Sequence, residues 1–161
     1  MNVQIIQVLT GAVAAFLISY FSVPILRKVA YLSDFYDKPD NDRKLHDRYV
    51  PTLGGVAIFL AFFMGFSISG LAEHIQGYPY FAAALTLLFF TGLKDDIVDL
   101  SAKTKLMVEL MVAGFLIFGC NMYISNFYGV LGIHEIPYWA SILVTTFTMI
   151  VVVNSYNLIA G

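Results

Sequence analysis

Five long apolar runs, separated by short polar connections, constrain the fold of this chain more than any other feature. A helix needs about 20 mostly apolar residues to cross the hydrocarbon core of a bilayer. Because lipid offers no hydrogen-bonding partners to the backbone, such runs are helical unless they alternate as barrel strands do, and this alternation is absent. We therefore expect an all-α fold, a polytopic transmembrane helix bundle that forms one domain over residues 1–161. The predicted spans are Val3–Leu26, Leu53–Leu71, Gln76–Leu93, Leu106–Ile124 and Pro137–Leu158.

The composition of the chain supports a membrane location. Of its 161 residues, 59% are hydrophobic and 12% are charged. Soluble domains are about 45–50% apolar and about 25% charged, so the core of a soluble domain does not account for these values. The net charge of −2 gives no indication of a nucleic-acid partner. The lipid bilayer is the expected surrounding.

The basic residues lie in only two connections, between the first and second runs and between the third and fourth. Cytoplasmic loops of membrane proteins carry the excess of Lys and Arg, so both connections are predicted to be cytoplasmic and the N-terminus to be outside. By parity, the fifth span then ends in the cytoplasm. Three polar segments, Arg43–Pro51, Asp95–Asp99 and Asn154–Asn157, are therefore predicted to reach the same membrane face.

The connection Gly92–Lys105 carries charges of both signs. If it is helical, Asp95, Asp96 and Asp99 share one face, because residues three and four apart are neighbours on a helix. Carboxylates that close repel unless a cation or a proton intervenes, and Mg²⁺ typically uses one or two carboxylates together with substrate phosphates. The segment therefore indicates phosphate chemistry at the membrane surface. The alternative is a solvated loop that merely ends two helices.

Polar residues near the ends of two spans add further candidates. Asn154 and Asn157 lie three residues apart on the fifth span, and their amide oxygens suit a metal ion, a ribose or a uracil. For this pair alone, helix capping or interhelical hydrogen bonding is the favoured role. Glu109 lies one turn inside the fourth span, where ionisable residues are usually functional or paired. We expect it to pair locally with Lys105.

A polar arm before the second span carries Arg43, Lys44, His46 and Arg48. Its cations suit a phosphate or a lipid headgroup, although each one singly is ordinary for a cytoplasmic loop. His46 fits a loop residue better than a metal ligand. The glycines at 54–55 permit close approach of a ligand or a neighbouring helix to the backbone.

Three blocks of the sequence resemble one known family in order and spacing. They are DRKLHDRYVPTLGGVAI at 42–58, GLKDDIVDLSAKTKL at 92–106 and VVNSYNLIAG at 152–161. The chain is similar to the N-terminal half of the polyprenyl-phosphate N-acetylhexosamine-1-phosphate transferases, glycosyltransferase family 4. This family includes initiators of O-antigen and teichoic-acid linkage synthesis. The resemblance implies a whole protein of about ten or eleven spans, of which this chain is a fragment.

The resemblance also implies roles for individual residues. Asp95, Asp96 and Lys105 match catalytic positions of the family, and the asparagines match its NxxN motif. We assign metal binding to Asp96 and Asn157. The predicted substrate-binding residues are Arg43, Lys44, His46, Arg48, Asn154 and Asn157.

Two positions depart from the family pattern. Ala160 stands where most bacterial members have Asp, and Glu109 replaces a usual Gln. A later cytoplasmic aspartate and the last loop of the family lie beyond Gly161, so we expect the fragment alone to be inactive.

The implied reaction transfers a sugar 1-phosphate from a UDP-activated amino sugar, with UDP-GlcNAc as the expected donor, to a polyprenyl phosphate such as undecaprenyl phosphate. It releases UMP and begins a cell-envelope glycan. The implied cofactor is Mg²⁺ or Mn²⁺, and the implied place is the cytoplasmic face of the inner membrane. A homodimer is left open. The alternatives are a non-enzymatic transporter or channel fragment whose carboxylates bind an ion, and an inactive truncated paralogue.

Overall fold

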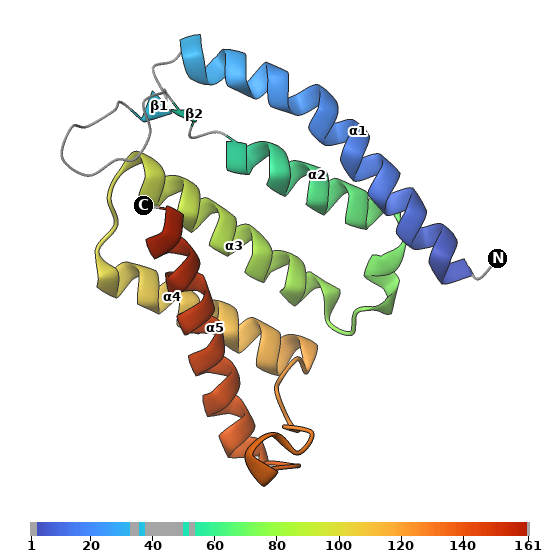
Figure 1. Cartoon of the computed structure of the whole chain (residues 1–161), viewed down its shortest axis with the longest axis vertical. Coiled ribbons are helices and arrows are strands. Elements are labelled where there is room, and N and C mark those ends of the chain that lie inside the picture. Colours follow the sequence, from blue (N-terminus) through green and yellow to red (C-terminus); the bar gives the residue numbers. More distant parts are fainter. Residues whose placement is uncertain (1–2, 33–35, 38–49, 52–53, 161) are drawn as a thin grey trace. The chain divides into compact units, whose positions relative to one another are not determined.

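The computed structural model describes residues 3–32, 36–37, 50–51 and 54–160. The chain divides into two compact units, Met1–His74 and Ile75–Gly161. Apart from one short strand pair and an isolated bridge, the described elements are helices (Figure 1). The expected all-α fold is confirmed.

Unit 1 is a pair of packed helices with short accessory elements. Helix α1 spans Val3–Leu32 and α2 spans Gly54–Ile68, followed by the 3₁₀ turn η1 at Leu71–His74. Between the helices, β1 (Tyr36–Asp37) pairs antiparallel with β2 (Val50–Pro51). The first helix therefore extends six residues beyond its predicted end at Leu26 (32 − 26).

Small residues bring α1 and α2 into close contact. A Cβ atom added to Gly65 would lie 2.8 Å from both the Ala15 Cβ and the Gly11 carbonyl oxygen. One added to Gly11 would lie 2.9 Å from the Ser69 Cβ. Membrane helices have no hydrophobic drive to associate within lipid, so such backbone approach, with its van der Waals contact, is their usual means of packing.

Unit 2 contains α3 (Tyr78–Ile97), α4 (Ala102–Gly114) and α5 (Tyr138–Ala160). A π-helical turn, η2 at Phe115–Gly119, continues α4, and a 3₁₀ turn, η3, covers Val130–Gly132. Ser101 caps α4 by accepting a hydrogen bond from the Thr104 N–H at 3.3 Å. The short link between α3 and α4 makes them a helical hairpin, which places the end of one helix beside the start of the other.

The two far ends of this hairpin are also in contact. Cys120 Sγ donates to the Gly77 carbonyl oxygen at 3.4 Å. Gly77 has a φ of 72°, and a Cβ atom there would overlap the carbonyl group of Gly119. Glycine is therefore required at this position for both its backbone conformation and its close approach.

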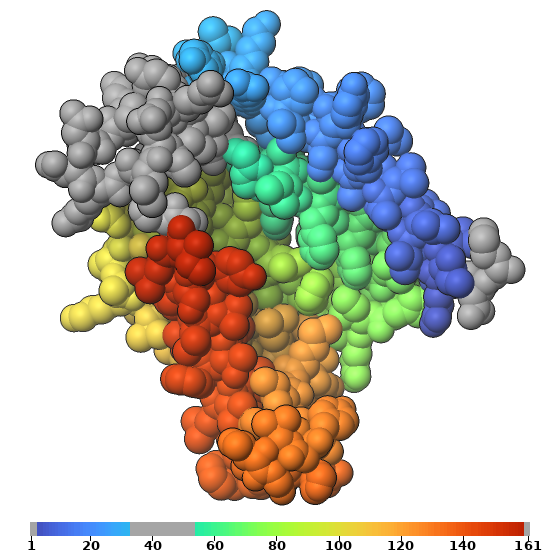
Figure 2. All heavy atoms as spheres, in the orientation of Figure 1, coloured from blue at the N-terminus to red at the C-terminus, as the bar shows by residue number. Residues whose placement is uncertain are grey.

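The connection between η2 and α5 forms a compact loop at one end of α5 (Figures 1 and 2). The Phe127 N–H donates to the His134 carbonyl at 2.8 Å, and the Gly129 N–H donates to the Ile133 carbonyl at 2.9 Å. The Ile124 N–H donates to Thr145 Oγ1 on α5 at 2.8 Å. These bonds hold the connection against the helix that follows it.

Two described helices, Val3–Leu32 and Tyr138–Ile159, are long and apolar enough to cross a membrane, and Gly54–Ile68 is a shorter apolar helix. Many large apolar side chains face outward, among them Phe16 and Phe147, which are 67% and 69% exposed. Water disfavours such surfaces, which is consistent with a membrane protein. Each of the five predicted apolar runs overlaps a helix, but the ends differ: α4 and η2 together cover residues 102–119 where 106–124 was predicted. That the helices cross the bilayer stays a prediction.

Candidate active site

An ion pair crosses the turn between α3 and α4. Asp95 lies in the last turn of α3, and its Oδ1 accepts a hydrogen bond from the Leu100 N–H at 2.9 Å. Its Oδ2 lies 2.6 Å from Nζ of Lys105, in the first turn of α4. Both carboxylate oxygens are therefore engaged, and one side chain holds the turn and positions a cation.

These contacts change the titration of both groups. Partial burial raises the pKa of Asp95, but Lys105, the Leu100 N–H and the Asn157 amide together lower it, so its net pKa lies below the ordinary value of 3.8. The hydrogen bond to Asp95 outweighs desolvation and raises the pKa of Lys105 above 10.5. Both groups are consequently charged at neutral pH.

The other two aspartates of the segment lie differently. The prediction that all three share a helical face is wrong for Asp99, because α3 ends at Ile97 and Val98 is extended. Asp99 is an exposed residue of the turn. Asp96 belongs to the last turn of α3 and is also exposed, since successive residues of a helix point about 100° apart. Asp95 is thus the aspartate that faces Lys105.

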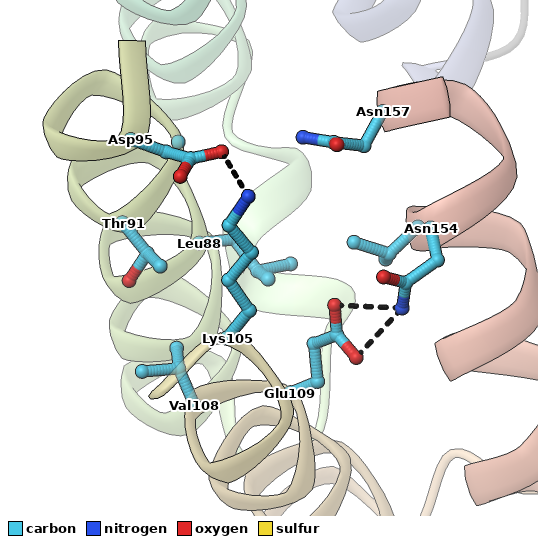
Figure 3. A pocket seen from close by; sticks show the side chains of 10 residues that line it. Leu88, Thr91, Asp95, Lys105, Val108, Glu109, Asn154 and Asn157 are labelled. Carbon is cyan, nitrogen blue, oxygen red and sulfur yellow. Dashed lines mark hydrogen bonds and ion pairs between the residues drawn. The ribbon is translucent and has the colours of Figure 1, made fainter. Parts of the chain in front are cut away.

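A second polar contact joins α4 to α5. Glu109 is only 5% exposed, and both of its carboxylate oxygens accept from Asn154 Nδ2 at 2.9 Å (Figure 3). The predicted pair between Glu109 and Lys105 is wrong, because the hairpin turn brings Asp95 within reach of Lys105. The interhelical hydrogen bonding favoured for Asn154 is confirmed.

A small cavity lies beside these two contacts. Its volume is about 70 Å³, which holds a few water molecules but is far below the roughly 300–1,000 Å³ of small-molecule pockets. A second hollow is larger, with a volume of about 290 Å³. Four residues line both spaces: Lys105, Glu109, Asn154 and Asn157. Charged and amide groups from α3, α4 and α5 therefore converge on one place in unit 2 (Figure 3).

Four predicted site residues come together here, Asp95, Lys105, Asn154 and Asn157. Asp96 is not among the residues that line either space. The predicted arm lies outside the described residues; its members are Arg43, Lys44, His46 and Arg48.

Two polar lining residues, Thr91 and Glu109, were not predicted for the site. Glu109 carried a signal in the sequence, since it is an ionisable residue inside an apolar run. Thr91 carried none. Its hydroxyl donates to the Leu87 carbonyl at 2.7 Å. Threonine side chains within helices often form this hydrogen bond to the carbonyl four residues before them.

Oxygen donors of the kind that Mg²⁺ prefers are present at the site. Asp95, Asn154 and Asn157 supply them, but Asp95 already has Lys105 as its counter-ion. Within the described ranges, no group of three or more His, Cys, Asp or Glu side chains is placed to hold a metal ion. A metal here would need other ligands as well, such as substrate phosphates. Metal binding by Asp96 and Asn157 stays a prediction.

Comparisons with known proteins cover both units. The profile described as Glycosyl transferase family 4 matches residues 78–161. An undecaprenyl-phosphate alpha-N-acetylglucosaminyl 1-phosphate transferase of Yersinia pestis is 29% identical over an alignment of 158 positions, which covers 94% of this chain and 41% of that protein. A probable undecaprenyl-phosphate N-acetylglucosaminyl 1-phosphate transferase of Bacillus subtilis (strain 168) is 31% identical over an alignment of 161 positions, which covers 92% of this chain and 42% of that protein.

A shorter match has higher identity. An undecaprenyl-phosphate alpha-N-acetylglucosaminyl 1-phosphate transferase of Thermotoga maritima is 39% identical over 97 residues, 60% of this chain and 30% of that protein. No solved structure matches the chain. The chain spans about two-fifths of the length of the first two relatives. The profile match and these relatives confirm the resemblance seen in the three sequence blocks: the chain belongs to glycosyl transferase family 4.

Proposed function

We propose that the protein transfers a sugar 1-phosphate, GlcNAc 1-phosphate, from a UDP-sugar to a polyprenyl phosphate and releases UMP. The names of the relatives support an undecaprenyl phosphate acceptor and an N-acetylglucosaminyl 1-phosphate donor. Because the chain spans about two-fifths of these relatives, the activity is proposed for the full-length protein. The observation that carries the proposal is the Asp95–Lys105 ion pair beside Asn157, where three helices meet.

In this reaction an oxygen of the polyprenyl phosphate attacks the phosphorus that bears the sugar. The bond from that phosphorus to the bridging oxygen breaks, and the bridging oxygen leaves with UMP. The reaction involves little covalent chemistry on the protein, so position and electrostatic stabilisation supply most of the catalysis. A site with one fixed cation and several hydrogen-bonding groups is suited to that task.

Each residue of the site has its own proposed role in this reaction. Lys105 stabilises charge on the transferred or departing phosphate, because a cation held in place by Asp95 needs no reorganisation during the reaction. Asp95 orients Lys105 and organises the acceptor phosphate, or accepts its proton. Asn154 and Asn157 position the nucleotide sugar from α5.

Mg²⁺ or Mn²⁺ bound with the substrate would offset the negative charge of the diphosphate. Asp96 and Asn157 are the proposed protein ligands. The Asp96 carboxylate is exposed at the end of α3, where substrate phosphates would complete the coordination.

We place this site on the cytoplasmic face of the inner membrane, with the N-terminus outside. The distribution of Lys and Arg over two connections supports this orientation. On that face, Arg43, Lys44, His46 and Arg48 would contact the phosphates of the substrates. The product would begin synthesis of a cell-envelope glycan.

The test compares two Asp→Asn variants of the full-length protein, Asp95→Asn and Asp99→Asn, in membrane vesicles. Transfer of radiolabelled GlcNAc 1-phosphate to undecaprenyl phosphate is measured together with UMP release. We expect Asp95→Asn to lose at least about 10²-fold in rate and Asp99→Asn, which changes an exposed turn residue, to keep the wild-type rate. Wild-type transfer by Asp95→Asn would overturn the proposed role. Solute uptake without a lipid-linked product would favour the transporter alternative.

A further inference from the structure

Glu109 is a buried carboxylate whose partner lies on another helix. It is 5% exposed, and both of its oxygens lie 2.9 Å from Asn154 Nδ2. The basic residue one turn before it, Lys105, is engaged with Asp95. A side chain needed only to fill space between α4 and α5 would be apolar, because a buried carboxylate must be compensated by hydrogen bonds. The contact with Asn154 therefore points to a polar role.

The hydrogen bonds around Asn154 determine which way its amide points. Its nitrogen also donates to the Ile150 carbonyl at 2.9 Å, so three acceptor oxygens surround it. An amide nitrogen donates and does not accept, whereas the amide oxygen only accepts. A flipped amide would place Oδ1 against those three oxygens. Glu109 thus excludes the flipped orientation.

The fixed orientation of the Asn154 amide decides which of its atoms faces the cavity. Asn154 and Asn157 both line it, and Figure 3 shows the Asn154 amide nitrogen at the contact with Glu109 and its carbonyl oxygen on the side of Lys105. With its nitrogen committed to Glu109 and Ile150, Asn154 presents an acceptor to the cavity. A hydroxyl or N–H group of a ligand matches this acceptor, and an anionic phosphate oxygen does not.

We propose that Glu109 is a positioning residue, which holds the Asn154 amide with its carbonyl oxygen toward the cavity so that it accepts a hydrogen bond from the nucleoside or sugar part of the UDP-sugar. This inference rests on the proposed function. Glu109 itself does not touch the substrate and acts through Asn154.

The test uses the full-length protein with Glu109→Leu, which removes the acceptor at similar size, and Glu109→Gln, which keeps one carbonyl oxygen. For purified, folded protein we expect Glu109→Leu to raise KM for UDP-GlcNAc about tenfold with a smaller change in kcat, and Glu109→Gln to stay within about threefold. Thermal unfolding of each variant is recorded in parallel. A purely structural residue would lower the melting temperature and leave the KM of the folded fraction unchanged.

A double-mutant cycle isolates the route through Asn154. In an Asn154→Ala background, Glu109→Leu is expected to have no further effect on KM, because the amide that it positions is gone. The inference is overturned if Glu109→Leu keeps the wild-type KM, or if it raises KM equally in the Asn154→Ala background. If the wild-type protein forms lipid-linked product, either of these two outcomes overturns only the role of Glu109 and leaves the proposed function intact. A wild-type protein that forms none overturns the proposed function, and the inference with it.

Discussion

Lys105 Nζ lies 2.6 Å from Asp95 Oδ2, across the turn that joins α3 to α4. The same carboxylate accepts the Leu100 N–H within that turn. One side chain therefore links the local geometry of the hairpin to the position of the cation in the candidate site. A change at either residue is expected to affect the site before it affects the helices, because both helices are formed by their own backbone hydrogen bonds.

Replacing Lys105 by Met removes the cation while keeping an unbranched side chain. We expect transfer of sugar phosphate to fall about 10²–10³-fold, the usual loss when a group that stabilises transition-state charge is removed. Lys103→Met is the matched control, since Lys103 is exposed on the first turn of the same helix. Rates are measured in vesicles with radiolabelled donor. Equal rates for the two variants would contradict a role for Lys105.

The same ion pair predicts how stability depends on pH. The folded pKa of Asp95 is lowered, so its contribution is present above 3.8 and is lost as the pH falls through the lowered pKa. The folded pKa of Lys105 is raised, so its contribution is complete below 10.5 and is lost as the pH rises through the raised pKa. The difference in melting temperature between wild type and Asp95→Asn should be constant between these limits and narrow outside them. Thermal unfolding in detergent over a pH series checks this, and a difference that varies around neutral pH would refute it.

Gly65→Ala is expected to weaken the packing of α1 against α2. The new methyl group would lie 2.8 Å from the Ala15 Cβ and from the Gly11 carbonyl oxygen, and such overpacking lowers the free energy of unfolding by about 1–3 kcal/mol. Gly114→Ala is the control, because nothing lies within 4 Å of its added Cβ. Glycine within a helix is less stable than alanine by about 0.5–1 kcal/mol, so this control should be neutral or stabilising. Denaturation of both variants in the same detergent compares them.

Ser101→Ala removes the side-chain cap of α4. Ser101 Oγ accepts the Thr104 N–H, and loss of such a cap typically lowers the free energy of unfolding by about 1 kcal/mol. Because the cap lies in the turn that holds Asp95 near Lys105, transfer activity should also decline, although less than in Lys105→Met. Unfolding and rate measurements on the same preparation check both expectations. A variant with lower stability but full transfer activity would show that the site stays intact when the first turn of α4 loses its cap.

Cysteine labelling tests the predicted topology. In a full-length background in which every native cysteine, including Cys120, is replaced by alanine, Asp99→Cys should react with an impermeant thiol reagent from the cytoplasmic side, and Leu131→Cys from the outer side. Both native side chains are exposed, Leu131 at 92%, so each new thiol is accessible to the reagent. Labelling of both positions from one side would overturn the five-span arrangement.

Part of the candidate site was open to prediction from the sequence. Asp95 and Lys105 stood out because a segment with charges of both signs separates two apolar runs. Asn154 and Asn157 stood out because they are amide side chains near the end of another apolar run. Asp99 was misplaced, since the end of α3 at Ile97 depends on local conformation that the spacing of aspartates does not reveal. Metal binding by Asp96 and Asn157 stays a prediction.

The sequence by itself determined that this chain forms helices, and which parts of the chain they occupy although not their exact ends, because an apolar run in lipid must satisfy its backbone hydrogen bonds within itself. That rule is local and can be read from consecutive residues. Only the tertiary structure decided which helix faces meet. Glu109 and Asn154 are 45 positions apart, and their pairing depends on how α4 and α5 pack, which no local pattern specifies. Packing therefore decided that Glu109 belongs with Asn154, and that Lys105 belongs with Asp95.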